Sequence, residues 1–184
     1  MIVIDDFIKD EALLNDIQND PSFFETRGYH WWNGWWNSPA NTIKKRLIEY
    51  IWAENSPYPS VDISGFEYWV GVYSQDEDRD ELPFHFDKDE YLWDTTKELV
   101  TPVIGTVFYP VENDIDGGYL EIYANGRDGE PERLEPKFNR LVIFEAGKHP
   151  HRVTPVTSGT RRAIAINLWD TEPSGVNNGE MILE

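Results

Sequence analysis

The sequence predicts a mainly β (α+β) fold, a jelly-roll sandwich or barrel with N-terminal helices packed on one sheet. Three observations point to this fold class. The length of 184 residues suits one globular domain. Two stretches with helical periodicity come before residue 60. From about residue 62, short segments rich in β-branched and aromatic residues alternate with Gly and Pro turns, a pattern typical of jelly rolls.

Two helices are expected in the N-terminal part of the chain. Asp10 can cap the first helix, over residues 10–17, whose apolar side chains fall on one face. Ser38 as N-cap and Pro39 as first helical residue predict the start of the second helix. Its apolar stripe comprises Ile43, Leu47, Ile48, Ile51 and Trp52. Helices placed before the strands would cover one outer face of the sheet.

Five segments after residue 62 have the composition of β-strands, and turn signals separate them. The predicted strands are residues 66–73, 102–109, 119–124, 140–145 and 161–169. The turn signals are Asp116-Gly117-Gly118, Asn125-Gly126, Asp128-Gly129 and Ser158-Gly159.

No repeat or linker divides the sequence, so we expect a single domain over residues 1–184. A helical support region, a β-helix core and a C-terminal tail are expected at residues 1–60, 61–170 and 171–184. The tail contains Pro and Gly residues, so it is expected to run over the surface.

The charge balance excludes several classes of function. With 16 Lys+Arg against 34 Asp+Glu the net charge is −18, so nucleic acid is not an expected partner. The absence of cysteine excludes disulfides, zinc-thiolate sites and thiol nucleophiles. The longest apolar-rich stretch, residues 99–111, is too short and interrupted to span a membrane, and the N-terminus has no signal-peptide pattern. We expect a soluble, cytoplasmic protein with no membrane partner.

His85 and Asp87 form a His-x-Asp pair, which predicts two metal ligands. If the pair lies on a strand, both side chains point to the same face. The third ligand would come from another strand, where the candidates are His149 and His151. Two His and one carboxylate on one face of an octahedron are typical of non-haem Fe(II) oxygenases. A surface ion pair between His85 and Asp87 is the alternative interpretation.

The segment after His151 predicts a cavity that holds an anion. A turn at Ser158-Gly159 would return the chain so that Arg161 starts a neighbouring strand. Alternation then places Arg161 on one face with the small side chains of Ala163 and Ala165, which leaves space for a ligand. The opposite face, packed against the helices, would hold Arg162, Ile164, Ile166 and Leu168.

A series of short motifs follows in order over about residues 65–170. It comprises His85-x-Asp87, Asp116-Gly117-Gly118-x-Leu120, Leu134-x-Pro136, Asn139-Arg140-Leu141-Val142-Ile143-Phe144 and His151-x-Val153-x-Pro155-Val156-x-x-Gly159-x-Arg161. Together with Ile4-Asp5-Asp6-Phe7, this series resembles the 2-oxoglutarate- and Fe(II)-dependent dioxygenases, specifically their prolyl 4-hydroxylase-like branch. Residues 135–140 are similar to the intracellular, oxygen-sensing type of prolyl hydroxylase.

The resemblance implies a double-stranded β-helix (jelly-roll, cupin-like) and a role for individual residues. By position, the iron ligands would be His85, Asp87 and His151. Arg161 would pair with the distal carboxylate of 2-oxoglutarate, which its planar, always charged guanidinium can bind bidentately. Tyr109 matches a tyrosine that donates to the same carboxylate, and Tyr73 resembles another tyrosine that lines the cofactor.

Several residues have two interpretations. His149 is a rival for the third ligand position, although the spacing to Arg161 favours His151. His30 lies among aromatic residues and is expected in packing or in a substrate groove rather than as a ligand. The run Trp31–Trp36 either wedges between helix and sheet or lines a groove for an extended, proline-containing peptide.

Two departures from the family pattern concern the prime substrate. Leu82 stands three residues before the first ligand, where relatives often have a tyrosine, and Asn167 stands where several have a tryptophan. Both changes would reshape the pocket around the substrate rather than around the iron. The acidic run 76–81 is expected to be a solvated loop or, if it borders the site, to select cationic substrates.

The resemblance implies an enzyme that uses Fe(II), 2-oxoglutarate and O₂, with ascorbate as a candidate cofactor. It would hydroxylate an unactivated C–H bond and release succinate and CO₂. The favoured substrate is a peptidyl proline in a protein or peptide. The alternatives are the same chemistry on a free amino acid or other small molecule, and a non-catalytic cupin-like barrel that binds a metal or ligand. Such a barrel has no need for Arg161 and Tyr109.

Overall fold

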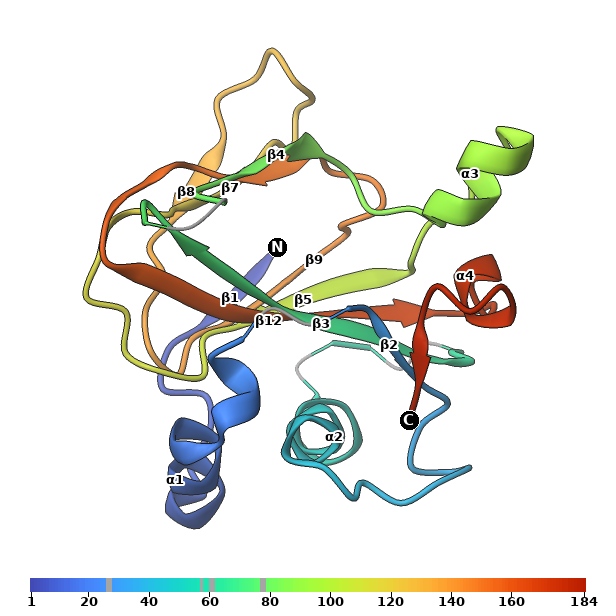
Figure 1. Cartoon of the computed structure of the whole chain (residues 1–184), viewed down its shortest axis with the longest axis horizontal. Coiled ribbons are helices and arrows are strands. Elements are labelled where there is room, and N and C mark those ends of the chain that lie inside the picture. The colour runs from blue at the N-terminus through green and yellow to red at the C-terminus, as the bar shows by residue number, and fades with distance from the viewer. Residues whose placement is uncertain (26–27, 57, 60–61, 77–78) are drawn as a thin grey trace.

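The computed structural model describes residues 1–25, 28–56, 58–59, 62–76 and 79–184. Its strands form two facing layers, and helices α1 (Glu11–Asn19) and α2 (Ile43–Glu49) cover the outer side of the larger layer (Figure 1). The arrangement is the predicted mainly β fold, a double-stranded β-helix with N-terminal helices packed on one sheet. Within the described ranges, no helix combines the length and apolar character that a bilayer span requires.

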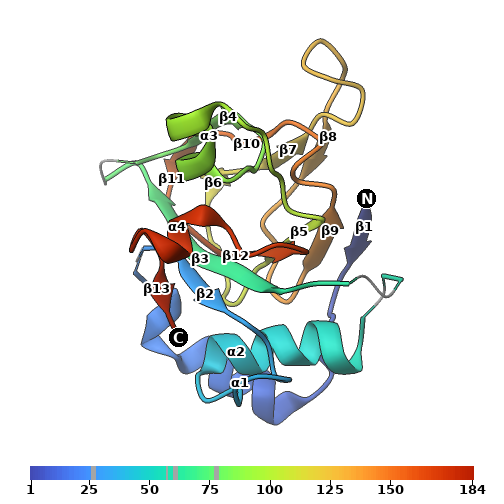
Figure 2. The same cartoon turned by 90° about the vertical axis from the view of Figure 1, so that its right-hand side faces the viewer.

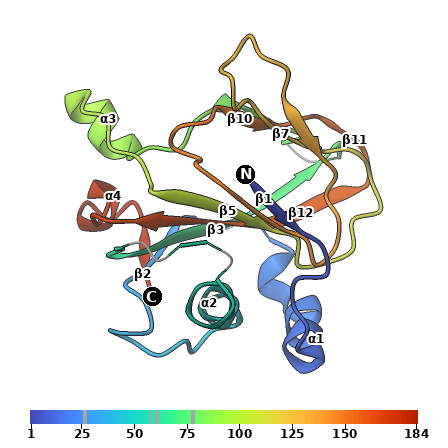
Figure 3. The ribbon, with the colours of Figure 1, turned by 180° about the vertical axis from the view of Figure 1, so that it is seen from behind.

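The larger sheet contains four of the five predicted strand segments. In order across the sheet, its strands are β1 (Ile2–Ile4), β9 (Leu141–Phe144), β5 (Ile104–Phe108), β12 (Thr160–Trp169), β3 (Gly65–Ser74), β2 (His30–Trp32) and β13 (Ile182–Leu183). Figure 3 shows β1 at the edge beside β9. The two longest strands, β3 and β12, pair over their whole lengths in the centre of the sheet and form the floor of the cavity described below.

The smaller sheet faces the larger one across that cavity. In order, its strands are β4 (Leu82–His85), β10 (His151–Val153), β7 (Leu120–Ile122) and β8 (Glu132–Leu134). The fifth predicted segment, residues 119–124, forms β7. Two further strands, β11 (Val156–Ser158) and β6 (Asp116–Gly117), pair separately. The turn predicted at Ser158-Gly159 connects β11 to β12, and Gly159 adopts a positive φ of 75° there.

The two N-terminal helices begin where side chains cap their free N–H groups. The Asp10 carboxylate accepts hydrogen bonds from the first turn of α1, as predicted. The predicted start of α2 at Ser38 and Pro39 is wrong, because Thr42 caps this helix instead. The Ser38 hydroxyl accepts a hydrogen bond from the indole of Trp32 at 2.7 Å. The helix continues as a π-helical turn, η2 (Tyr50–Glu54), and a 3₁₀ turn, η1 (Pro21–Phe23), follows α1.

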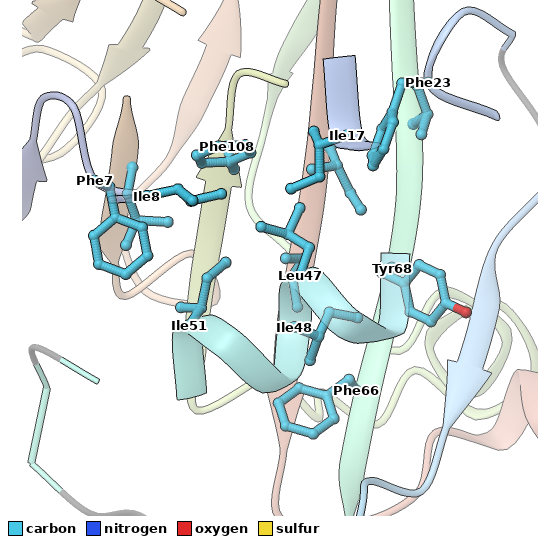
Figure 4. Close-up of a cluster of buried hydrophobic side chains, with 14 of the residues drawn as sticks. Phe7, Ile8, Ile17, Phe23, Leu47, Ile48, Ile51, Phe66, Tyr68 and Phe108 are labelled. Carbon is cyan, nitrogen blue, oxygen red and sulfur yellow. The ribbon is translucent and has the colours of Figure 1, made fainter. Parts of the chain in front are cut away.

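The main hydrophobic core lies between these helices and the outer face of the larger sheet (Figure 4). Leu47, Ile48 and Ile51 are fully buried there against the side chains of Phe66 and Phe108. Of the β12 side chains predicted for this face, Ile164, Ile166 and Leu168 belong to the cluster. The fourth, Arg162, has its guanidinium carbon 5.0 Å from the ring centroid of Phe24. Burying an Ile, Leu or Phe side chain stabilises the fold by about 1.5–3 kcal/mol. This core therefore fixes β12 and β3 in place.

The C-terminal residues lie largely at the surface, where they also form regular secondary structure that the sequence did not indicate. β13 pairs in parallel with β2. The short helix α4 (Ser174–Asn177) lies beside α3 (Glu90–Thr96), as Figure 2 shows. Val176 packs with Trp31 and Trp169 in a small cluster. Pairing between such distant segments leaves no signature in local sequence patterns, so the tail could not be placed from sequence.

Candidate metal centre and cavity

Three side chains that can bind a metal ion converge between the two sheets. His85 ends β4, and His151 begins β10 directly opposite it in the ladder. With Asp87, two residues after His85, they offer ligand atoms that all lie within 4.8 Å of one another. The rival His149 lies outside this cluster, where its Nε2 is 3.4 Å from a carboxylate oxygen of Glu145. The structure thus brings together the set favoured from the sequence.

Asp87 lies beyond the end of strand β4, whereas it was expected on the same strand as His85. β4 ends at His85, so the two residues do not lie on one continuous strand. The backbone N–H of Asp87 donates to the carbonyl of Ala146 at 3.0 Å, which fixes the chain beyond the strand end. The Asn167 amide donates to Oδ2 of Asp87 at 3.0 Å. Oδ1 lies 3.3 Å from Nε2 of His85 and 3.6 Å from Nε2 of His151.

Both imidazoles present Nε2 to the cluster. Nδ1 of His85 lies 2.7 Å from the carbonyl oxygen of Pro83, and Nδ1 of His151 lies 3.0 Å from that of His149. Because a carbonyl oxygen can only accept, Nδ1 carries the proton in each ring. The lone pair of each Nε2 is therefore available to a metal ion.

Burial and charge set the protonation of these side chains. Burial lowers the pKa of His151, although the charge of Asp87 opposes this. Burial alone would raise the pKa of Asp87, but the hydrogen bond from His85 and the positive charges of the two imidazoles, in their protonated forms, hold it below its usual range. Burial also acts to lower the pKa of His85, but the hydrogen bond and charge of Asp87 outweigh it and raise the pKa. A neutral His151 and an ionised Asp87 are the forms that ligate metals, whereas at His85 a metal competes with a proton.

The donor set fits a non-haem Fe(II) ion. Two atoms bound to one ion by bonds of about 2.1 Å can lie no more than about 4.2 Å apart, and both nitrogen–oxygen distances above satisfy this limit. Two imidazoles and one carboxylate form the facial arrangement that leaves coordination positions for other ligands. The chemistry of the donors and their spacing therefore suit Fe(II).

A cavity joins this cluster to Arg161, whose side chain is buried with 3% exposure. Small and apolar side chains line it, among them Gly105, Val107, Leu120, Phe144, Ala146 and Ala163. In the part of the chain that the structure describes, no carboxylate forms an ion pair with the Arg161 guanidinium. Because a buried charge without a counter-charge is costly, this arrangement suits an anionic ligand in the cavity.

Neighbouring groups hold the guanidinium of Arg161 in place. Nε donates to the carbonyl of Gly118 at 2.9 Å, and a terminal nitrogen donates to the Tyr109 hydroxyl at 3.2 Å. The Tyr73 ring lies 5.6 Å from the guanidinium carbon. Gly118 has a positive φ of 65°, and a Cβ there would lie 3.1 Å from Cδ of Arg161. The predicted cofactor residues Tyr109 and Tyr73 therefore both lie beside Arg161, and the glycine turn leaves room for its side chain.

At the other end of the cavity floor, the structure reveals a buried carboxyl group that the sequence analysis missed. Glu67 of β3 lies opposite Asn167 of β12. The Asn167 amide nitrogen is 3.3 Å from Oε2 of Glu67 and also donates to Asp87. Burial, then the charge of Asp87, raises the pKa of Glu67 to about 8. Strand alternation could have found this residue, because Glu67 shares its face with Trp69 and Tyr73.

A second, larger groove adjoins the cluster and is lined by Tyr29, Glu67, Trp69, Leu82, Tyr91 and Asn167, among others. Both departures from the family pattern, Leu82 and Asn167, line it. Arg79 is the one residue that the described part of the acidic run 76–81 contributes to this groove, since residues 77–78 lie outside the described ranges.

The other aromatic and histidine candidates lie elsewhere. Trp32 packs on Phe66 in the helix–sheet core, with ring centroids 5.7 Å apart, and Trp35 packs on the same ring. This contact supports the packing interpretation of the tryptophan run. His30 stacks on Tyr68, and its Nδ1 lies 2.9 Å from a carboxylate oxygen of Glu184. His30 therefore belongs to the sheet edge rather than to the metal-binding cluster.

The model of the 2OG-Fe(II) oxygenase superfamily matches residues 68–169, more than half of the chain. The chain belongs to this superfamily. It is therefore an oxygenase, and its cofactors are Fe(II), 2-oxoglutarate and O₂. Among proteins with curated descriptions, none matches the sequence.

Solved structures of prolyl hydroxylases share the fold of this 2OG-Fe(II) oxygenase at low sequence identity. A prolyl-4-hydroxylase from Pseudomonas putida matches with a TM-score of 0.60 and 16% identity, over 93% of this chain and 92% of that one. A viral collagen prolyl hydroxylase from Paramecium Bursaria Chlorella virus-1, in a 2OG complex, gives 0.52 and 13%, over 93% and 96%. A Trichoplax adhaerens prolyl hydroxylase in complex with a hypoxia inducible factor peptide gives 0.51 and 14%, over 92% and 83%.

Proposed function

We propose that this oxygenase hydroxylates a proline residue in a protein or peptide, with release of succinate and CO₂. The observation that carries the proposal is the position of the metal-binding cluster between two spaces. One is the cavity that ends at the buried Arg161, and the other is the groove lined by Tyr29 and Trp69. The first suits a small dianion and the second an extended substrate. The fold shared with three prolyl hydroxylases over more than nine-tenths of the chain supports a peptide in the groove.

In this proposal, each side chain at the site has a separate task. The iron is held by His85, Asp87 and His151. When the iron is bound there together with 2-oxoglutarate and O₂, it would supply the chemistry that oxidises an unactivated C–H bond. Arg161 holds the distal carboxylate of 2-oxoglutarate by charge-assisted hydrogen bonds, with the help of the Tyr109 hydroxyl, and Tyr73 lines the same space.

The rest of the cavity orients the reactants and excludes water. The carbonyls of Pro83 and His149 keep the imidazole protons on Nδ1, so that both Nε2 atoms face the metal. The Asn167 amide directs Asp87 by holding its Oδ2. Apolar walls, among them Phe144 and Leu120, keep the space around the co-substrate dry, which strengthens the electrostatic attraction to Arg161.

We also propose that residues 1–184 act as one domain. The cytoplasmic location of the protein stays a prediction.

Two assays test the proposal. Release of succinate from 2-oxoglutarate, measured with Fe(II) and ascorbate, tests the use of the co-substrate. Mass spectrometry of a panel of proline-containing peptides, read for the gain of one oxygen, tests the prime substrate. We expect succinate release and a single oxygen gained on proline. Oxygen gained by a free amino acid or small metabolite instead would assign the same chemistry to a small-molecule substrate, and the absence of both succinate and 2-oxoglutarate binding would contradict the assignment of the cavity.

A further inference from the structure

We propose that Glu67 is a specificity-determining residue that binds a cationic nitrogen, an ammonium or a guanidinium, of the prime substrate. The inference deepens the proposed function and rests on it, because it takes the groove beside the metal centre as the substrate site. Four observations support it: the place of Glu67 on the cavity floor, its uncommitted oxygen, the charges around it and the aromatic rings beside it.

The first observation is that the two ends of the cavity floor carry groups of opposite kind, the guanidinium of Arg161 at one end and the carboxyl of Glu67 at the other. Arg161 pairs with Tyr73 at one end of the β3–β12 ladder, and Asn167 pairs with Glu67 six residues further along each strand. At about 3.3 Å per residue, the two ends are about 20 Å apart. Asn167 contacts Asp87, so the metal centre lies along this floor. A co-substrate held at Arg161 leaves the Glu67 end for the prime substrate.

The second observation is that one carboxyl oxygen of Glu67 accepts no hydrogen bond from the described residues of the protein. The residue is 7% exposed, yet it lines the groove. The Asn167 amide and the Trp169 indole, at 3.3 and 3.0 Å, both donate to Oε2. Among the described residues, no hydrogen bond reaches Oε1. Oε1 is not fully enclosed by protein atoms, so it is open to the groove, where a ligand can donate a hydrogen bond to it.

The third observation is that two other charged residues of the groove, Asp89 and Lys88, already have partners. Asp89 accepts hydrogen bonds from the N–H groups of Leu92 and Ser174, and Lys88 pairs with Glu90 at 2.6 Å. Among the described acids that line the groove, Glu67 is therefore a buried one with an oxygen left to receive a cation. Its pKa, raised to about 8 by burial and by the charge of Asp87, means that it is largely protonated without a ligand. A bound cation would favour its ionised form.

The fourth observation is a pair of aromatic rings next to this carboxyl. The rings of Tyr29 and Trp69 lie 4.9 Å apart, and both residues line the groove with Glu67. Aromatic faces attract ammonium and guanidinium groups, and the attraction increases when water is excluded. A buried carboxylate combined with aromatic faces recognises a cation better than it recognises a neutral donor, because both elements favour positive charge.

The experiment measures binding to the full chain loaded with Fe(II) and 2-oxoglutarate under anaerobic conditions, by titration calorimetry. The probes are blocked peptides with one proline and a lysine at each flanking position in turn, each with an Nε-acetyl-lysine twin. Free lysine is paired with free Nε-acetyl-lysine, and free arginine with the neutral citrulline. We expect at least one lysyl peptide, or a free basic amino acid, to bind at least about tenfold more tightly than its neutral twin. The peptide and free amino acid arms distinguish the two sources of the cation.

Variants then assign the preference to one residue. In Glu67→Gln, which keeps an acceptor for Asn167 and Trp169, the ratio should fall to about one. Glu180→Gln removes an exposed carboxylate from the same groove and should leave the ratio within about twofold. If circular dichroism shows that Glu67→Gln does not fold, Glu67→Asp replaces it, with a reduced ratio expected.

No preference for lysine over acetyl-lysine in the wild type, or a ratio that Glu67→Gln leaves unchanged, would overturn the proposal. The proposed function is judged separately, because hydroxylation is read by mass spectrometry and co-substrate use by succinate. A cation preference without oxygen gained on proline would therefore reject the proline substrate and keep the role of Glu67.

Discussion

The two faces of the β3–β12 ladder differ completely in chemistry, although they consist of alternate residues of the same two strands. Apart from Arg162 at one end, the face toward the helices is mainly apolar and fully or almost fully buried, with Phe66, Tyr68, Val70, Ile164, Ile166 and Leu168. The face toward the smaller sheet carries Arg161 and Tyr73 at one end and Glu67 and Asn167 at the other.

This difference teaches that stability and ligand binding are assigned to opposite faces of one structural element. Because side chains two residues apart share a face, a single pair of strands can build a hydrophobic core and a polar cavity at once. Substitutions on the two faces should therefore have separable effects, which the following predictions test.

Ile166→Ala on the core face should give the largest loss of stability. Ile166 is fully buried in the main core, so its truncation should lower the free energy of unfolding by about 2–5 kcal/mol. Urea unfolding measures this change. The affinity for 2-oxoglutarate, measured below the unfolding transition, should stay within about twofold of the wild type. A loss of affinity comparable to that of a cavity-face variant would contradict the separation of the two faces.

Arg161→Gln on the cavity face should weaken 2-oxoglutarate binding. Loss of charge-assisted hydrogen bonds, about 1.5–3 kcal/mol, corresponds to about 10–100-fold in the dissociation constant. Stability should change little, because the substitution removes a buried charge that has no carboxylate partner within the described chain. Arg162→Gln is the matched control. Its guanidinium lies 5.0 Å from the ring centroid of Phe24, outside the cavity, so the affinity should be unaffected.

Glu67 should make the stability of the metal-free protein depend on pH. Its pKa of about 8 in the folded state exceeds its usual value of 4.5, so the folded protein keeps a proton that the unfolded chain releases. The free energy of unfolding should therefore fall as pH rises from about 4.5 to about 8, by at most about 1.4 kcal/mol per pH unit from this group. Urea unfolding at several pH values should show a smaller fall for Glu67→Gln. Parallel profiles for the two proteins would reject the raised pKa.

Tyr109→Phe should have a smaller effect than Arg161→Gln, and Tyr73→Phe the smallest of the series. It removes the hydroxyl that accepts a hydrogen bond from Arg161, worth about 0.5–1.5 kcal/mol, so 2-oxoglutarate should bind about 2–10-fold more weakly. Tyr73→Phe should weaken binding less, because its ring lies 5.6 Å from the guanidinium carbon and the structure shows no hydrogen bond between these two described residues. Calorimetric titration of both variants ranks them, and the reverse order would contradict this reading of the site.

The sequence patterns predicted the parts of the fold that depend on alternation. Residues 161–169 directly predict the two faces of β12. Small or charged side chains alternate there with bulky apolar ones. The convergence of His85 and His151 was expected from motif spacing, and the ladder places them opposite each other. These features are local, or depend on a family pattern, and so they are visible in one sequence.

Other features depend on long-range pairing or on exposed surfaces and were not predictable in this way. Helix α3 has no buried residues, so it lacks the apolar stripe by which a helix is recognised. The pairing of β13 with β2 joins the two ends of the chain. Strand alternation places Glu67 on the cavity face, but its burial and its hydrogen bonds depend on Trp169 and Asn167 from a distant strand, which local patterns do not show.

The central claim is that His85, Asp87 and His151 form one Fe(II) site, and iron binding by two histidine variants tests it most directly. His151→Ala removes a ligand atom from the cluster, whereas His149→Ala removes a nearby imidazole that pairs with Glu145 instead. Equilibrium dialysis against Fe(II) under anaerobic conditions measures the stoichiometry. We expect one iron per chain in the wild type and in His149→Ala, and a loss of binding in His151→Ala. Iron retained by His151→Ala and lost in His149→Ala would contradict the assignment.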